Sequence, residues 1–135
     1  MRKLFALCAL LLALTTGLSQ AYAAPAAGGS VPAYSASASV SDATPAQGRS
    51  ITVTGRLLAA GKAAAGVQMR QVWHYRTYTV SCTATTDRNG RASCIHNIRN
   101  ATRGYAVRVD ITFLKNGKVI ASSTARFVPR EGGKG

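Results

Sequence analysis

Apolar and polar residues alternate along several short stretches of this 135-residue chain, and this alternation restricts its possible fold more than any other feature. In the clearest example, Tyr105–Phe113, every second residue is apolar or aromatic, and the residues between them include an arginine and an aspartate. A period of two is typical of a β-strand with one buried face. No stretch between residues 35 and 129 has the apolar period of an amphipathic helix. The pattern therefore predicts an all-β domain.

Turn-forming residues separate several of these stretches. Asp87–Gly90 and Lys115–Lys118 each contain the dipeptide Asn-Gly, which is the strongest short signal for a hairpin turn. The stretches expected to be strands are 35–40, 50–58, 67–75, 79–84, 91–95, 105–113 and 119–127. About seven short strands at regular spacing are typical of an antiparallel β-sandwich.

The first 23 residues have the features of a secretion signal. Arg2 and Lys3 precede an apolar stretch at Leu4–Leu14, which is too short to span a bilayer. Ala21 and Ala23 provide the small residues that signal peptidase requires at positions −3 and −1. We therefore expect cleavage after Ala23, no transmembrane segment, and a mature protein that is periplasmic or secreted.

The remaining chain is long enough for one small domain. Removal of 23 of the 135 residues leaves 112. Residues 24–34 are rich in Ala, Gly, Ser and Pro and are expected to be a flexible lead-in. The β-sandwich is expected at 35–129, followed by a flexible tail at 130–135.

The mature chain keeps two cysteines, Cys82 and Cys94, and an even pair in an exported protein predicts a disulfide. The two positions are symmetric about Arg88 in a predicted turn, so we expect them opposite each other on the two strands of a hairpin. Metal binding by these thiols with His74 and His96 is a weak alternative, because no ligand-like spacing links the four residues. We expect no metal site and no cofactor.

Several motifs resemble a bacterial immunoglobulin-like domain of exported surface proteins. The matching segments are Ile51–Gly55, Gly61-Lys62 and Gly66-Val67 before the strand with Trp73, then Cys82, Gly90–Cys94 and Gly104–Val107. The resemblance covers about Ser41–Val128 and implies an immunoglobulin-like sandwich with Trp73 in its core. It departs from the family at Ala64, where such domains often have proline. Domains of this family are spacers, adhesion modules or accessory binding modules, so the resemblance implies a non-catalytic role.

The charge of the chain is strongly positive. When Arg2 and Lys3 leave with the leader, 15 basic residues remain against 4 acidic ones, a net charge of about +11. Such an excess attracts anionic polymers such as lipopolysaccharide or acidic glycans, whereas the alternative interpretation is a solvated surface that keeps the protein soluble. Specific nucleic-acid binding is not expected.

Four arginines are the candidate polyanion-binding residues. The alternation places them on the outer face of three strands that form one sheet in immunoglobulin-like sandwiches: Arg70, Arg76, Arg108 and Arg126. Guanidinium groups match the geometry of phosphate and carboxylate groups. These four residues would form a flat cationic surface.

Few residues are suited to catalysis. His74 and Asp110 would face each other if their strands pair, and a nearby serine would complete a triad. An exposed strand surface has no cleft that excludes water, so we expect no enzyme activity and no catalytic residues. A hydrolase is the remote alternative.

The function expected from the sequence is therefore that of a non-catalytic binding module at the cell envelope or outside it. Its partner would be an anionic envelope polymer or a surface protein. The alternative is a structural or accessory component of a surface assembly, in which an exposed edge strand pairs with a strand of another protein.

Overall fold

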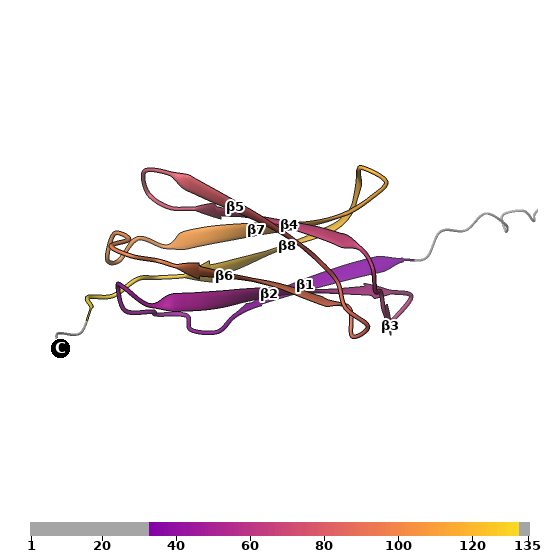
Figure 1. Ribbon diagram of the computed structural model, residues 1–135, viewed down its shortest axis with the longest axis horizontal. Coiled ribbons are helices and arrows are strands. Elements are labelled where there is room, and N and C mark those ends of the chain that lie inside the picture. Colours follow the sequence, from indigo (N-terminus) through magenta and orange to yellow (C-terminus); the bar gives the residue numbers. More distant parts are fainter. Residues whose placement is uncertain (1–32, 133–135) are drawn as a thin grey trace, which may run out of the picture. The chain divides into compact units, whose positions relative to one another are not determined.

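The computed structural model describes residues 33–132, all of whose regular elements are β-strands (Figure 1). The strands are β1 (Tyr34–Val40), β2 (Ser50–Ala59), β3 (Lys62–Ala63), β4 (Gln68–His74), β5 (Thr79–Thr85), β6 (Arg91–Asn97), β7 (Val107–Lys115) and β8 (Lys118–Phe127). The predicted all-β class is confirmed. The seven longer strands correspond to the seven predicted ones, whereas the two-residue β3 has no counterpart in the sequence pattern.

The strands form two antiparallel sheets (Figure 1). In the first sheet β2 is central, with β1 along one side and β6 and β3 along the other. The second sheet has the order β5-β4-β7-β8. Because β4, β7 and β8 are neighbours in this order, the outward residues of these three strands share one surface.

The apolar residues predicted to face inward form a core between the two sheets. Its largest fully buried members include Leu57 and Ile51 from the first sheet, and Trp73, Met69, Ile111 and Phe113 from the second. The core position predicted for Trp73 is confirmed. Burial of such side chains stabilises by about 1.5–3 kcal/mol each, so this layer supplies the main driving force for association of the sheets.

Side chains of the second sheet pack directly against Gly55 on β2. A Cβ atom at this position would lie 2.8 Å from Sδ of Met69 and 3.0 Å from Cζ of Phe113. Gly55 therefore leaves the space that two large side chains of the second sheet occupy.

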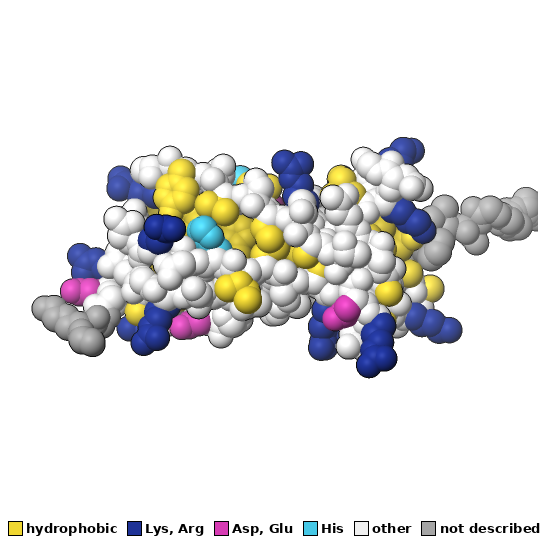
Figure 2. Space-filling view, in the orientation of Figure 1, with side chains coloured by type: hydrophobic (Ala, Val, Ile, Leu, Met, Phe, Trp, Pro, Cys, Tyr) yellow, Lys and Arg dark blue, Asp and Glu magenta, His cyan; other side chains and the backbone are white. Residues whose placement is uncertain are grey.

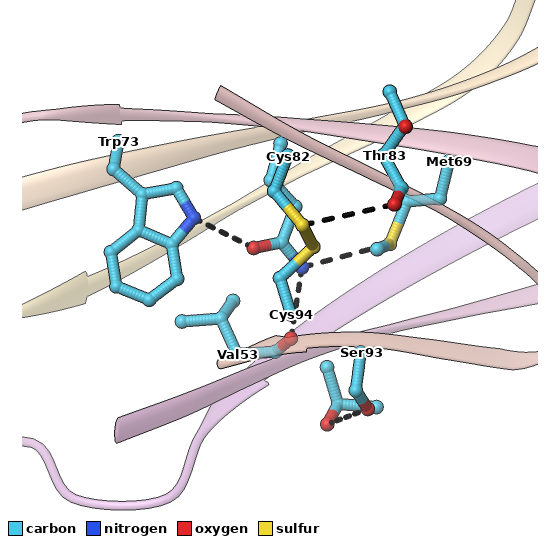
Figure 3. Close-up of a disulfide and its surroundings, with 9 residues drawn as sticks. Val53, Met69, Trp73, Cys82, Thr83, Ser93 and Cys94 are labelled. Carbon is cyan, nitrogen blue, oxygen red and sulfur yellow. Dashed lines mark hydrogen bonds between the residues drawn. A yellow bond between two sulfur atoms is a disulfide. The ribbon is translucent and has the colours of Figure 1, made fainter. Parts of the chain in front are cut away.

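The predicted disulfide between Cys82 and Cys94 is confirmed, with a Cα–Cα distance of 6.4 Å (Figure 3). The predicted hairpin geometry is wrong. Cys82 lies on β5, which pairs with β4, whereas Cys94 lies on β6, which pairs with β2. The disulfide therefore joins the two sheets to each other.

The contacts of Thr86 explain why β5 and β6 do not form a hairpin. Its backbone N–H donates to the carbonyl of Val67, and its buried hydroxyl donates to the carbonyl of Ala64. These bonds hold the end of β5 against the segment that precedes β4, up to the turn at Asp87–Gly90. Beyond the turn, the N–H of Leu57 donates to the carbonyl of Gly90, which draws the chain to β2.

The ends of the domain differ slightly from the predicted boundaries. β1 begins at Tyr34, and Arg130 of the predicted tail donates its N–H to the carbonyl of Pro45. The predicted signal peptide (1–23), the lead-in up to residue 32 and the last three residues lie outside the described range. Between residues 33 and 132, the structure contains no helix of the length and apolar character that crossing a membrane requires.

The structure corrects the predicted start of the strand at Tyr105. The alternation predicts it as the first inward residue of a strand, but β7 begins only at Val107. The N–H of Tyr105 instead donates to the carbonyl of Thr102 in a turn, and the residue is 38% exposed. Gly104, with a φ of 77°, forms the bend that interrupts the strand here.

Candidate anion-binding surfaces

The outer face of the second sheet brings Arg108 and Arg126 together. They are directly opposite each other on β7 and β8, and both are exposed. Residues in this relation have Cα atoms about 4.5–5.5 Å apart, so their side chains rise from the sheet as neighbours. The sequence-based placement of both arginines on one outer face thus agrees with the register of these strands.

His74 and Asp110 lie beside this pair of arginines. His74 is opposite Arg108 in the pairing of β4 with β7, and its Nε2 is 2.9 Å from Oδ2 of Asp110. The Nε of Arg108 is 3.1 Å from Oδ1 of the same carboxylate. Asp110 therefore compensates Arg108, whereas Arg126 takes part in no ion pair with another described residue.

Arg70 and Arg76 lie farther from this group. Arg70 is on the same face of β4, four residues before His74, which corresponds to about 13 Å along a strand. Arg76 lies beyond the end of β4, in the connection to β5. The structure therefore assembles two of the four predicted arginines side by side and leaves the other two separate.

The outer face of the first sheet carries a second cationic group, which the sequence pattern does not reveal. Arg56 on β2 is directly opposite Arg91 on β6, and both are exposed. Ser37 on β1 completes the same cross-strand row. Finding this row requires knowledge that β6 pairs with β2, and the hairpin expected between β5 and β6 conceals that pairing.

A row of hydroxyl groups runs next to Arg56 and Arg91. It consists of Ser39, Thr54 and Ser93, which are register partners on β1, β2 and β6. The Oγ1 of Thr54 is 2.8 Å from Oγ of Ser93. These residues and both arginines line a hollow of about 700 Å³ that reaches the end of β5.

Asp87 is the acidic residue that lines this hollow. Its Oδ1 accepts hydrogen bonds from the backbone N–H groups of Asn89 at 2.8 Å and Arg91 at 3.1 Å. The bonds from Arg91 and Asn89 hold the pKa of the Asp87 carboxyl below its usual value. The carboxylate thus stabilises the turn between β5 and β6.

An aromatic cluster surrounds His96 at the ends of β4 and β6. The His96 ring lies 5.4 Å from that of Trp73 and 5.9 Å from that of Tyr75, between ring centroids. Tyr78 stacks on Tyr75 at 4.7 Å. Burial, aided by the charge of Arg99, lowers the pKa of His96, and burial raises the pKa of Tyr75.

Figure 2 shows Lys and Arg side chains at several separate places on one side of the domain, with hydrophobic side chains between β5 and β6. On this side the two sheets are joined by the disulfide and share no paired strands. Within residues 33–132, no group of three His, Cys, Asp or Glu residues is arranged to hold a metal ion.

Comparisons with known proteins add no assignment. The chain matches no protein-family model and no curated protein sequence. Among solved structures it is similar to an alkylpurine DNA glycosylase, AlkC, of Pseudomonas fluorescens, bound to DNA containing an abasic site analog. That similarity has 18% sequence identity and a TM-score of 0.43, and it covers 73% of this chain. The chain spans about 31% of the glycosylase.

Proposed function

We propose that this chain is an exported, non-catalytic immunoglobulin-like domain that binds anionic polymers of the cell envelope. The binding surface is the outer face of the second sheet. The two-sheet antiparallel arrangement with a buried Trp73 supports the immunoglobulin-like classification. A disulfide between Cys82 and Cys94 supports export, because disulfides persist in oxidising compartments.

The pair formed by Arg108 and Arg126 carries the functional proposal. Like charges directly opposite each other destabilise a sheet by a few tenths of a kcal/mol to about 1 kcal/mol. An anionic group bound between the two guanidinium groups would remove this repulsion and accept hydrogen bonds from both. Asp110 pairs with His74 and Arg108 but not with Arg126, so the surface at Arg108 and Arg126 retains a net positive charge.

The separation of the arginines favours a polymer over a small anion. Arg70 lies about 13 Å along the same face, too far to contact an anion held by Arg108 and Arg126. A chain with charges at repeated intervals contacts both positions at once. Lipopolysaccharide and acidic glycans have such repeated charges.

The experiment is salt-gradient elution of the mature protein, residues 24–135, from heparin and lipopolysaccharide columns. The test variant replaces Arg70, Arg76, Arg108 and Arg126 with Ser. A matched control replaces four other exposed arginines with Ser: Arg49, Arg88, Arg99 and Arg103. Both variants lose four positive charges, so they differ only in the position of the loss.

We expect wild type and control to elute well above physiological salt and the test variant to elute much earlier. Equal shifts in both variants would show that net charge alone determines retention. Elution of the wild type at or below physiological salt would overturn polymer binding.

Strand β5 supports a second candidate function, that of a structural component of a surface assembly. It pairs with β4 on one side, and within residues 33–132 no strand pairs with its other edge. A free edge offers backbone groups to a strand of a partner protein. This function predicts co-fractionation with insoluble envelope material that high salt does not release, whereas salt releases a polyanion binder.

A further inference from the structure

We propose that the outer face of the first sheet is a separate binding site for a charged sugar unit of an acidic polysaccharide. Arg56 and Arg91 would bind its sulfate or carboxylate group. The hydroxyl row of Ser39, Thr54 and Ser93 would bind its sugar hydroxyls. This site goes beyond the proposed function, because it uses other residues on the opposite sheet.

The first observation is the juxtaposition of two unpaired cations. Arg56 and Arg91 are register partners, so their Cα atoms are about 4.5–5.5 Å apart. Neither takes part in an ion pair with another described residue. Their repulsion opposes sheet formation, and an anion that bridges both guanidinium groups would relieve it.

The nearby carboxylate does not fill this role. Asp87 lines the same hollow, but its Oδ1 is occupied by the backbone N–H groups of Asn89 and Arg91. It orders the turn that leads into β6 and thereby fixes the start of the strand that carries Arg91. The charge of Arg91 contributes to lowering the pKa of the Asp87 carboxyl, but Asp87 forms no ion pair with Arg56 or Arg91, so both guanidinium groups remain able to bind an external anion.

The second observation is the hydroxyl row. Arg56 and Thr54 are two residues apart on β2, as are Arg91 and Ser93 on β6, so the row lies about 7 Å from the arginine pair. This separation is within the span of a single sugar ring and its substituent. Short hydroxyl side chains donate and accept hydrogen bonds, as sugar hydroxyls do.

The hollow also has a suitable size and lining. Its volume of about 700 Å³ lies within the range of small-ligand sites. Among residues 33–132, its lining includes no aromatic side chain, which binding of single-stranded nucleic acid would use for base stacking. The same lining residues also include no large apolar side chain that would accommodate an acyl chain. The lining therefore favours a charged sugar over a nucleic acid or a lipid.

The two cationic surfaces face in opposite directions, since the sheets bury their inner faces against each other. A domain with both sites would link two polysaccharide chains. This linking rests on the proposed function of the second sheet, whereas the site at Arg56 and Arg91 does not.

The test measures binding of a heparin-derived tetrasaccharide by calorimetry, in a background with Arg70, Arg76, Arg108 and Arg126 replaced by Ser. In this background the second sheet contributes no arginine. Three further variants are added: Arg56→Gln with Arg91→Gln, Ser39→Ala with Ser93→Ala, and, as a charge-matched control, Arg49→Gln with Lys118→Gln. All these positions are exposed, and circular dichroism verifies that each variant is folded.

We expect the Arg56/Arg91 variant to weaken binding at least tenfold, the serine variant to weaken it several-fold, and the control to leave it within twofold. Inorganic sulfate and an uncharged tetrasaccharide should each bind at least tenfold more weakly than the heparin fragment. An unchanged Arg56/Arg91 variant would overturn the site. Equal affinity for sulfate, or for an oligothymidylate, would overturn its assignment to an acidic polysaccharide. If only the proposed binding by the second sheet is wrong, all these measurements still test the site at Arg56 and Arg91, because the background lacks the arginines of the second sheet.

Discussion

The side-chain amide of Gln71, on the second sheet, donates a hydrogen bond of 2.8 Å to the backbone carbonyl of Val53, on the first. The register partner of Gln71 on β5 is Cys82, and that of Val53 on β6 is Cys94. A hydrogen bond and a disulfide therefore join the sheets at adjacent positions. The other end of the Gln71 amide accepts the indole N–H of Trp73 at 2.8 Å (Figure 3).

Replacement of Gln71 by Leu should lower the free energy of unfolding by about 2–4 kcal/mol. The change removes the hydrogen bond that the Trp73 N–H donates to Gln71 and the one that the Val53 carbonyl accepts from Gln71. Each buried polar group that loses its partner costs about 1–3 kcal/mol of stability. Urea denaturation measures the effect. Gln68→Leu, at an exposed position of the same strand, should stay within about 0.5 kcal/mol. Equal stability of wild type and Gln71→Leu would refute a structural role of this side chain.

The double variant Cys82→Ala with Cys94→Ala should lose about 3 kcal/mol, the chain-entropy value for closing a loop of this length. Because the bridge joins sheets, its loss should also increase hydrogen exchange of β5 amides. Wild type under reducing conditions should behave in the same way. An increase in hydrogen exchange that is confined to the turn at Asp87–Gly90 would instead indicate that the disulfide joins the two strands of a hairpin.

Gly90→Ala should destabilise more than Gly117→Ala, by about 1–3 kcal/mol. Both glycines have positive φ values, 76° and 79°, so both substitutions impose similar backbone strain. A Cβ at Gly90 would lie 2.5 Å from the carbonyl oxygen of Leu57, whereas at Gly117 it would meet no atom within 4 Å. Thermal denaturation of the two variants measures the difference. Equal losses would mean that the contact with Leu57 is unimportant.

His96 should make the free energy of unfolding fall as the pH drops below 6.5, the ordinary pKa of histidine. Its pKa is lowered from 6.5 in the folded protein, mainly by burial, so the unfolded chain takes up a proton more readily. The stability due to neutral His96 is present above pH 6.5 and is lost as the pH falls through the folded pKa. The difference in unfolding free energy between wild type and His96→Gln should shrink as the pH falls below 6.5. A constant difference would contradict this assignment.

The seven longer strands could be read from the sequence because most of their residues alternate between a more exposed and a less exposed face. The pairing of β6 could not. The symmetry of Cys82 and Cys94 about Arg88 fits both a hairpin and a crossover between sheets, and the buried contacts of Thr86 decide between them. Such contacts join residues about 20 positions apart, and no local pattern reports them.

The candidate surfaces also differ in whether local sequence patterns could predict them. The outward positions of Arg108 and Arg126 follow from strand alternation, and their sheet order from the resemblance to immunoglobulin-like domains. The row of Arg56 and Arg91 depends on the β2–β6 pairing and was therefore missed. Likewise, Gln71 is visible in the sequence as a polar residue among inward positions, but its partner Val53 is 18 residues away on another sheet.

The most direct test of the central claim is an NMR titration of the mature protein with a heparin-derived hexasaccharide at physiological salt. It follows backbone amides and arginine Nε–H groups. Saturable shifts at Arg108 and Arg126, extending to Arg70, are the predicted result. Shifts that do not saturate, or that are absent from these three arginines, would contradict polyanion binding by the second sheet.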